Sequence, residues 1–180
     1  IDKYISCDIP SELEDKELNE IVTSVQMHCK RHSKSCQKKG TTCRFNFPRQ
    51  PSEKTFITRH VDKDDKENSN EKKEARELLN TVKGSVTNDV KFNDTKMLFD
   101  ALKITQKELE DASNLVTKRD DFVLKRNPQT AWVNQYNPFL LRAWNANMDL
   151  QYVSNVYATV AYVVTYLSKA EREMGVLLSQ

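Results

Sequence analysis

Residues 28–43 read HCKRHSKSCQKKGTTC, and this stretch determines how the N-terminal part of the chain is expected to fold. Four of its residues are common metal ligands, spaced as H-x3-H-x3-C-x6-C: His28, His32, Cys36 and Cys43. Histidines four residues apart lie on one face of a helix, and a loop at 38–42 can return Cys43 to the same point. Two imidazoles and two thiolates complete a tetrahedral shell for zinc, so the spacing predicts a closed, structural zinc site.

Two other interpretations of this stretch stay open. The histidines can lie on the surface beside reduced thiols, or two cysteines can form a disulfide in a secreted protein, although the sequence shows no secretory leader. Cys29 is the first substitute ligand, although it points to a different side of the expected helix from His28. Cys7 is distant in sequence, and we expect it to be buried.

The same stretch lies in the most basic part of the chain. The net charge is only +2, from 28 Lys and Arg against 26 Asp and Glu, yet residues 30–59 hold nine basic side chains and one acid, Glu53. Such an excess suits a polyanion such as nucleic acid, and a solvated basic face is the alternative. The candidate contacts here are Lys30, Lys34, Lys38, Lys39, Arg44 and Arg49.

Outward from this stretch, the apolar spacing around Leu18 predicts a helix over about 11–31. A loop-rich segment follows, with a short strand at 43–47. Twelve of the sixteen residues in 62–77 are charged, which predicts a solvated linker or insertion with a helix at its end. We therefore expect a helix plus a basic zinc-binding segment at 1–60 and a charged linker or insertion at 61–94.

Residues 95–180 are expected to form the rest of an α+β fold. Two short helices are predicted at 95–102 and 105–115, the second with a capping box between Thr105 and Glu108. Strands at 122–124 and 148–153 should belong to an antiparallel sheet. A last helix, from about 155 to 173 with Gly175 as its end signal, should pack on that sheet.

Composition excludes some classes of function. Only 38% of the residues are hydrophobic, and polar residues interrupt the longest uncharged stretch, 150–168, which predicts a buried helix rather than a membrane span. The chain has only three glycines and no phosphate-binding loop, so we expect no nucleotide hydrolysis. The sequence opens on Ile1 rather than Met, and we expect it to be a piece of a longer protein.

Three residues on the last helix have the spacing of a reactive site. Tyr162, Tyr166 and Lys169 lie on one helical face. A phenol becomes a nucleophile where a cation or metal favours its ionised form, and a phosphodiester is the natural electrophile. Lys169 could neutralise charge on the phosphate or the leaving oxygen. Core packing is the alternative, because Tyr, Val and Leu at helical spacing usually pack.

Aromatic rings beside cations offer a further route to single-stranded DNA, by base stacking. Tyr136, in the turn Asn-Gln-Tyr-Asn-Pro, is the better stacking candidate, with Arg126 and Arg142 as its cationic neighbours in sequence. For Trp144 and Phe139 we favour core packing.

Four segments in this order resemble the replicase portion of Helitron transposons. The resemblance covers most of the chain except the charged stretch at about 62–88. The four segments are VQMHCKRHSKSCQKKGTTCRFNFPR (25–49), LKRNP (124–128), NQYNPFLLRAWNANMDLQYV (134–153) and YVVTYLSKAEREMG (162–175). Proteins of this family join a rolling-circle replication initiator, with an HUH-type nuclease, to a C-terminal superfamily-one DNA helicase. The resemblance implies that residues 95–180 are the tyrosine-helix half of the nuclease domain, acting on single-stranded DNA in the nucleus.

The resemblance also assigns roles to residues. It implies that Tyr162 and Tyr166 are the catalytic nucleophiles of a Y-x3-Y-x2-K helix, with Lys169 as the assisting cation. The family's H-x-H pair, which binds Mg²⁺ or Mn²⁺, does not occur in this chain, and His60 is a poor substitute. Asp149 or Gln151 could supply a remaining ligand.

This departure from the family pattern limits what the chain can do by itself. Helicase motifs are also missing from it, so we expect helicase activity and complete metal binding only in the parent replicase. The expected partners are single-stranded DNA and the remainder of the parent, with no membrane. The alternative is a non-catalytic, zinc-dependent nucleic-acid-binding module.

Overall fold

The computed structural model describes residues 1–32, 36–37, 43–59, 70–87, 92–118, 120–151, 153 and 156–178. The chain divides into two compact units, Ile1–Leu150 and Gln151–Gln180, and each is described by itself. Among the described residues, no helix is long and apolar enough to cross a membrane. The last helix belongs to the second unit and the sheet to the first, so the packing of this helix on the sheet stays a prediction.

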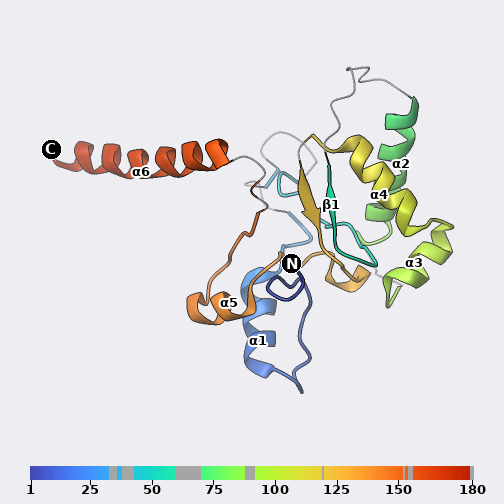
Figure 1. The fold of residues 1–180 in the computed structure, drawn as a ribbon. Coiled ribbons are helices and arrows are strands. Elements are labelled where there is room, and N and C mark those ends of the chain that lie inside the picture. Colours follow the sequence, from blue (N-terminus) through green and yellow to red (C-terminus); the bar gives the residue numbers. More distant parts are fainter. Residues whose placement is uncertain are drawn as a thin grey trace. The chain divides into compact units, whose positions relative to one another are not determined.

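Helices and a small antiparallel sheet give the first unit an α+β fold, as predicted (Figure 1). Its elements in chain order are α1 (Lys16–Ile21), the π-helix η1 (Val22–Gln26), β1 (Phe56–Thr58), α2 (Asn70–Gly84), α3 (Thr95–Leu102), α4 (Gln106–Val116), β2 (Asp121–Val123), the 3-10 helix η2 (Pro128–Thr130) and α5 (Pro138–Trp144). The second unit contains α6 (Val156–Leu178).

The segment 126–136 ties three distant parts of the N-terminal half together. Isolated antiparallel bridges join it to Ser6, to Met27 and to Ser52. Next to the last of these bridges, β1 pairs with β2, with Phe56 opposite Val123. The region around the metal-ligand pattern is therefore held by residues from the far end of the unit.

Two hydrophobic clusters fill the first unit. The larger lies where α2 and α4 pack side by side (Figure 1) and includes Val82, Leu98, Leu109 and Trp132. The smaller joins α1 to α5 around Leu18, Val22, Val133, Tyr136 and Leu141.

Local capping signals set the helix starts. Thr105 caps α4, and its backbone and hydroxyl both donate to the Glu108 carboxylate, which confirms the capping box. Asp94 caps α3, because its carboxylate accepts from Met97 N at 2.8 Å. Thr95 is buried and donates to the carbonyl of Arg126.

The predicted helix over 11–31 is wrong at its C-terminal end. Regular α-helix stops at Ile21, and the π-helix stops at Gln26. The hydroxyls of Thr23 and Ser24 donate back to carbonyls of the preceding turn, which disturbs helical geometry. Met27 is then extended and bridges Val133, so the chain leaves the helix before the first histidine.

Four other expectations are corrected. Residues 43–47 form turns rather than a strand, and the described residues of 148–153 carry no strand. Helix α6 continues through Gly175 to Leu178. The helix predicted at the end of the charged stretch is present as α2, but its Ala75 and Val82 are buried, so the described part of 61–94 belongs to the packed unit rather than to a solvated linker. Residues 61–69 and 88–91 lie outside the described ranges.

Candidate metal centre and tyrosine helix

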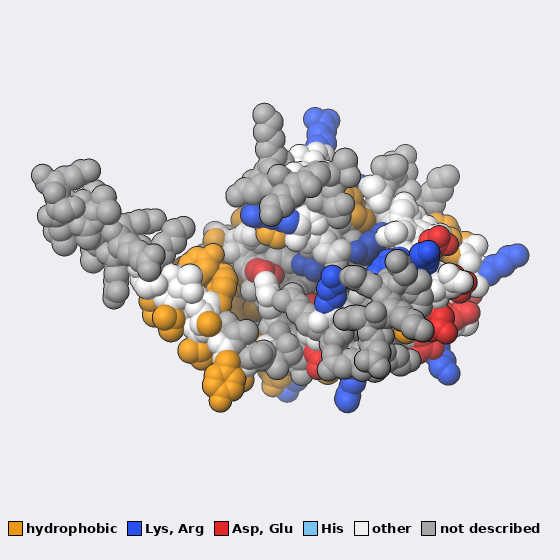
Figure 2. All heavy atoms as spheres, turned by 90° about the horizontal axis from the view of Figure 1, so that it is seen from above, with side chains coloured by type: hydrophobic (Ala, Val, Ile, Leu, Met, Phe, Trp, Pro, Cys, Tyr) orange, Lys and Arg blue, Asp and Glu red, His pale blue; other side chains and the backbone are white. Residues whose placement is uncertain are grey.

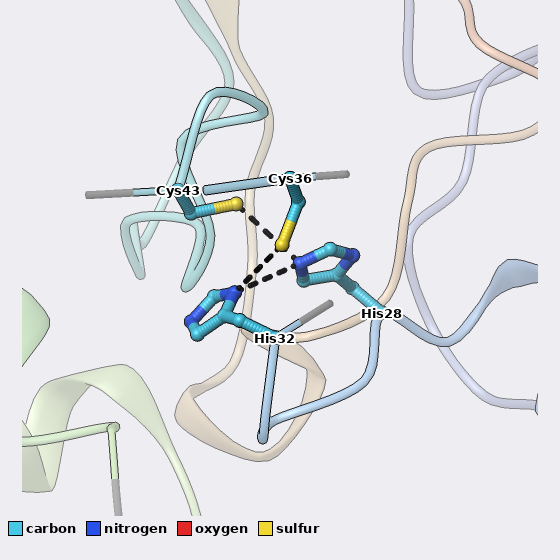
Figure 3. Close-up of side chains that lie close together, drawn as sticks. All are labelled: His28, His32, Cys36 and Cys43. Atoms are coloured by element: carbon cyan, nitrogen blue, oxygen red, sulfur yellow. Dashed lines mark hydrogen bonds between the residues drawn. The ribbon is translucent and has the colours of Figure 1, made fainter. Parts of the chain in front are cut away.

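The four residues of the ligand pattern meet at one point (Figure 3). Their ligand atoms all lie within 4.8 Å of one another, and we call His28, His32, Cys36 and Cys43 the metal cluster. The two cysteines are buried and the two histidines are half-buried. All four side chains point toward a common centre, so the group could hold a metal ion.

Distances inside the metal cluster fit ligands around one ion. His28 Nε2 lies 3.2 Å from His32 Nδ1, while Cys36 Sγ to His32 Nδ1 and Cys43 Sγ to His28 Nε2 are each 3.4 Å. A tetrahedral ion with bonds of about 2.0–2.3 Å separates its N and S ligands by roughly 3.3–3.8 Å. The three contacts are close to the edges of such a tetrahedron, so they are better explained as a ligand shell than as mutual hydrogen bonds.

Loop geometry rather than a helical face brings the histidines together. His28 N donates to the carbonyl of Trp132 at 2.8 Å, which fixes the start of the loop. The chain then turns, with His32 N donating to Cys29 O and His32 in the left-handed region at φ 52°. The predicted ligands are therefore correct in number and identity, although the helical route to them is wrong.

A backbone hydrogen bond and two stacked aromatic side chains also hold the metal cluster in place. Arg44 N donates to Cys36 O at 2.9 Å and thus closes the loop that returns Cys43. The His28 ring stacks on Phe47, with centroids 4.4 Å apart, and lies parallel to Trp132 at 6.2 Å. The Trp132 indole is anchored in turn, because its Nε1 donates to Val86 O at 3.1 Å.

Burial also suits the metal cluster to its ligand role. It lowers the pKa of His28, and the neighbouring charges of His32 and Arg49 lower it further. A lowered pKa keeps the imidazole neutral at neutral pH, which is the form that binds metals. The sequence did not single out Phe47 and Trp132 as supports, although the aromatic residues after Cys43 were a signal.

The other two cysteines differ from the cluster pair. Cys29 is exposed and takes no part in the metal cluster. Cys7 is buried, as expected, and its thiol donates to Lys125 O at 3.2 Å. Burial raises the pKa of Cys7 to about 11, so it stays a thiol.

The basic candidates of residues 30–59 have different surroundings. Lys30 and Arg44 are exposed, and the Arg44 guanidinium lies 4.5 Å from the centre of the Phe45 ring. Arg49 is mostly buried beside Phe47. Lys34, Lys38 and Lys39 lie outside the described residues.

Tyr136 and Arg126 are corrected as DNA contacts. Tyr136 is 1% exposed and its hydroxyl donates to Asp8 O at 2.8 Å, so no base can reach the ring. Arg126 is 3% exposed and donates to the carbonyls of Thr130 and Val133. Burial lowers the pKa of Arg126 to about 10, which still leaves it charged at neutral pH.

Helix α5 corrects the remaining aromatic assignments. Phe139 is 77% and Trp144 is 71% exposed, whereas core packing was expected for both. The Arg142 guanidinium is paired with the carboxylates of Asp15 and Glu17, so its charge is largely neutralised within the protein.

Helix α6 carries the two candidate nucleophiles. Tyr162 and Tyr166 are each 61% exposed, and their ring centroids are 4.7 Å apart. Lys169 lies on the same helix, but its side chain is outside the described part. The pair therefore presents two neighbouring phenol rings on one face of α6.

A comparison of the chain with family models, curated proteins and solved structures found no match. The functional interpretation thus depends on the metal cluster, the basic residues and the tyrosine pair.

Proposed function

We propose that the chain is part of a Helitron-like replicase that nicks and joins single-stranded DNA in the nucleus during rolling-circle transposition. The observation that carries the proposal is the tyrosine pair. Tyr162 and Tyr166 lie one turn apart on α6, with their ring centroids 4.7 Å apart. The resemblance of four segments to Helitron replicases supports the same role.

The proposed reaction is a transesterification. The phenol oxygen of one tyrosine loses its proton and bonds to phosphorus, while the bond from phosphorus to the 3′ oxygen breaks. The 3′ oxygen takes up a proton and leaves as a hydroxyl, and the 5′ phosphate stays on the tyrosine. A second tyrosine one turn away allows a second transfer at the same site, with Lys169 proposed to neutralise phosphate charge.

The nuclease also needs a divalent ion. In the parent, Mg²⁺ or Mn²⁺ would make the phosphorus more electrophilic, with ligands mostly outside this chain. The isolated chain is therefore expected to bind DNA without cutting it.

We propose that the ion of the metal cluster is zinc, in a structural role. Two imidazoles and two thiolates with no open position are typical of structural zinc. The ion would hold the loop from His28 to Cys43 against Trp132, and so position the basic residues around it.

Trapping the covalent intermediate tests the proposed chemistry. The parent replicase is incubated with labelled single-stranded DNA and Mn²⁺, and protein–DNA adducts that survive denaturation are counted. Tyr162→Phe and Tyr166→Phe should each block one transfer, and the double variant should block both, because only the attacking oxygen is removed. Tyr157→Phe is the matched control, since Tyr157 is 89% exposed on the same helix, and it should behave as the wild type. An adduct formed by the double variant would refute the assignment.

The metal cluster and its exposed basic neighbours favour one second candidate, a non-catalytic nucleic-acid-binding module. In that case DNA binding would depend on zinc, and no adduct would form with any variant.

A further inference from the structure

The first unit contains a cavity of about 350 Å³. Its volume falls in the range of small-ligand sites, about 300–1,000 Å³. Residues from the loop after Cys43, from α2 and from the β2 region line it, among them Asn46, Arg49, Lys83, Asp121 and Arg126. Figure 2 shows Lys and Arg side chains gathered in the middle of the face seen there.

The lining of this cavity carries more positive than negative charge. Arg49, Lys83 and Arg126 contribute three positive charges, although the buried Arg126 acts through its charge and not as a direct contact. Asp121 is the one carboxylate among the described lining residues. Asp149 also acts electrostatically on Arg49. Even with both carboxylates counted, a positive charge remains in a partly enclosed space.

The cations of the lining are held in place by the fold. Lys83 lies in the last turn of α2 and its Nζ donates to Asn46 Oδ1 at 2.5 Å. The backbone of Arg49 donates to Ala131 O at 2.7 Å, and its guanidinium lies 4.9 Å from the centre of the Phe47 ring. Arg49 and Lys83 therefore face the cavity from two elements fixed against each other.

One donor of Arg49 lacks an acceptor. Its Nε is buried and has no hydrogen-bond partner among the described residues. Leaving a buried charged donor without an acceptor destabilises a protein, because the donor has lost its hydration without gaining a hydrogen bond. Burial lowers the pKa of Lys83, and the charge of Arg49 lowers it further, so the two cations repel each other. A bound anion would satisfy the Nε donor and remove this repulsion.

We propose that this cavity binds a phosphate group. A guanidinium supplies directed donors to phosphate oxygens and an ammonium supplies a compact charge, which together suit phosphate. That the phosphate comes from a phosphodiester of single-stranded DNA rests on the proposed function. That the cavity binds a phosphate group does not depend on the proposed function.

Binding by the zinc-loaded chain tests the inference. Fluorescence anisotropy measures affinity for a labelled single-stranded oligonucleotide at several salt concentrations, and phosphorus NMR measures binding of inorganic phosphate. Lys83→Gln should weaken oligonucleotide binding about tenfold, as expected for one charged hydrogen bond. The slope of log K against log salt should become shallower by about 0.7, because the variant neutralises one phosphate fewer.

Two further variants control for charge and folding. Lys73→Gln makes the same charge change at an exposed position of α2 and should change neither quantity. Lys83→Arg keeps the cation and should restore most of the affinity. Zinc content and thermal unfolding establish that each variant is folded.

The outcomes separate this inference from the proposed function. Loss of both oligonucleotide and phosphate binding in Lys83→Gln supports a phosphodiester site. Loss of phosphate binding alone supports the phosphate site and overturns its DNA role. If Lys83→Gln behaves like Lys73→Gln in both measurements, the inference is wrong, even where the parent forms its tyrosine adduct. If the parent forms no adduct while Lys83→Gln loses binding, the site stands without the nicking reaction.

Discussion

At the scale of single residues, Tyr136 illustrates how a ring beside polar neighbours can belong to the core. Its hydroxyl is satisfied by a backbone carbonyl, and its ring packs with Leu18 and Val133. The motif Asn-Gln-Tyr-Asn-Pro does not predict that Tyr136 is buried, because the hydrogen-bond partner Asp8 lies at the other end of the unit. Phe139 and Trp144, only a few residues away, have the opposite environment.

Tyr136→Phe tests the corrected role. The substitution removes one hydrogen bond and leaves Asp8 O without its donor, so the free energy of unfolding should fall by about 1 kcal/mol. Urea denaturation measures this decrease. Oligonucleotide affinity should not change, and a folded variant with clearly weaker DNA binding would restore Tyr136 as a stacking residue.

At the scale of elements, the segment from Cys36 to Arg44 should carry a large share of the DNA affinity. Replacing Lys38, Lys39 and Arg44 with Gln should make the salt slope shallower by about 2, because each phosphate that a cation neutralises contributes about 0.7 on single strands. Anisotropy titrations at several salt concentrations measure the slope.

The matched control for this segment removes the same charge from helices. Lys73, Lys96 and Lys107 are exposed on α2, α3 and α4, and their replacement by Gln should leave the slope near that of the wild type. Equal slopes for the two triple variants would mean that the DNA path lies elsewhere.

Elements defined by local signals were predictable, and those defined by distant partners were not. The start of α4 follows from Thr105 and Glu108, which are three residues apart. The end of the first helix depends on the bridge between Met27 and Val133, which the sequence does not display. A helix at the end of the charged run was predicted, but the packing of α2 was not, since its apolar stripe of Ala75, Leu78 and Val82 extends past that run and is buried only through contact with α4.

The metal cluster was predictable because its chemistry is specific. Few arrangements of two histidines and two cysteines within sixteen residues serve another purpose, and the loop only needs to close. Its surroundings were not predictable. Trp132 reaches the cluster from far along the chain, and Lys83 reaches the cavity from a segment that composition assigned to a linker.

At the scale of the whole molecule, the metal and the larger core should be lost together. Cys36, Cys43, Phe47 and Trp132 belong to one hydrophobic cluster with the buried side chains of α2, α3 and α4. Elemental analysis should find about one zinc per chain, as a single four-ligand site requires. The double variant Cys36→Ser with Cys43→Ser should lose that zinc and unfold at a lower temperature, because metal binding and folding are coupled.

Cys29→Ser is the matched control for the double variant, because it removes an exposed thiol outside the metal cluster. It should keep both the zinc and the unfolding temperature. Addition of a strong chelator to the wild type should reproduce the defect of the double variant. A structural metal would be contradicted if the double variant kept its zinc, or if the chelator left the unfolding temperature of the wild type unchanged.

The bridges from segment 126–136 also have a consequence during protein synthesis. Both cluster thiols leave the ribosome well before Trp132, whose carbonyl fixes His28 and whose ring backs the metal cluster. At 5–20 residues per second, the roughly ninety residues between Cys43 and Trp132 take about 5–20 s to make. Through that interval the nascent chain offers two open thiols beside a basic loop, where they are most reactive. A metal ion bound by His28, His32, Cys36 and Cys43 would protect these thiols until the far half of the unit covers them.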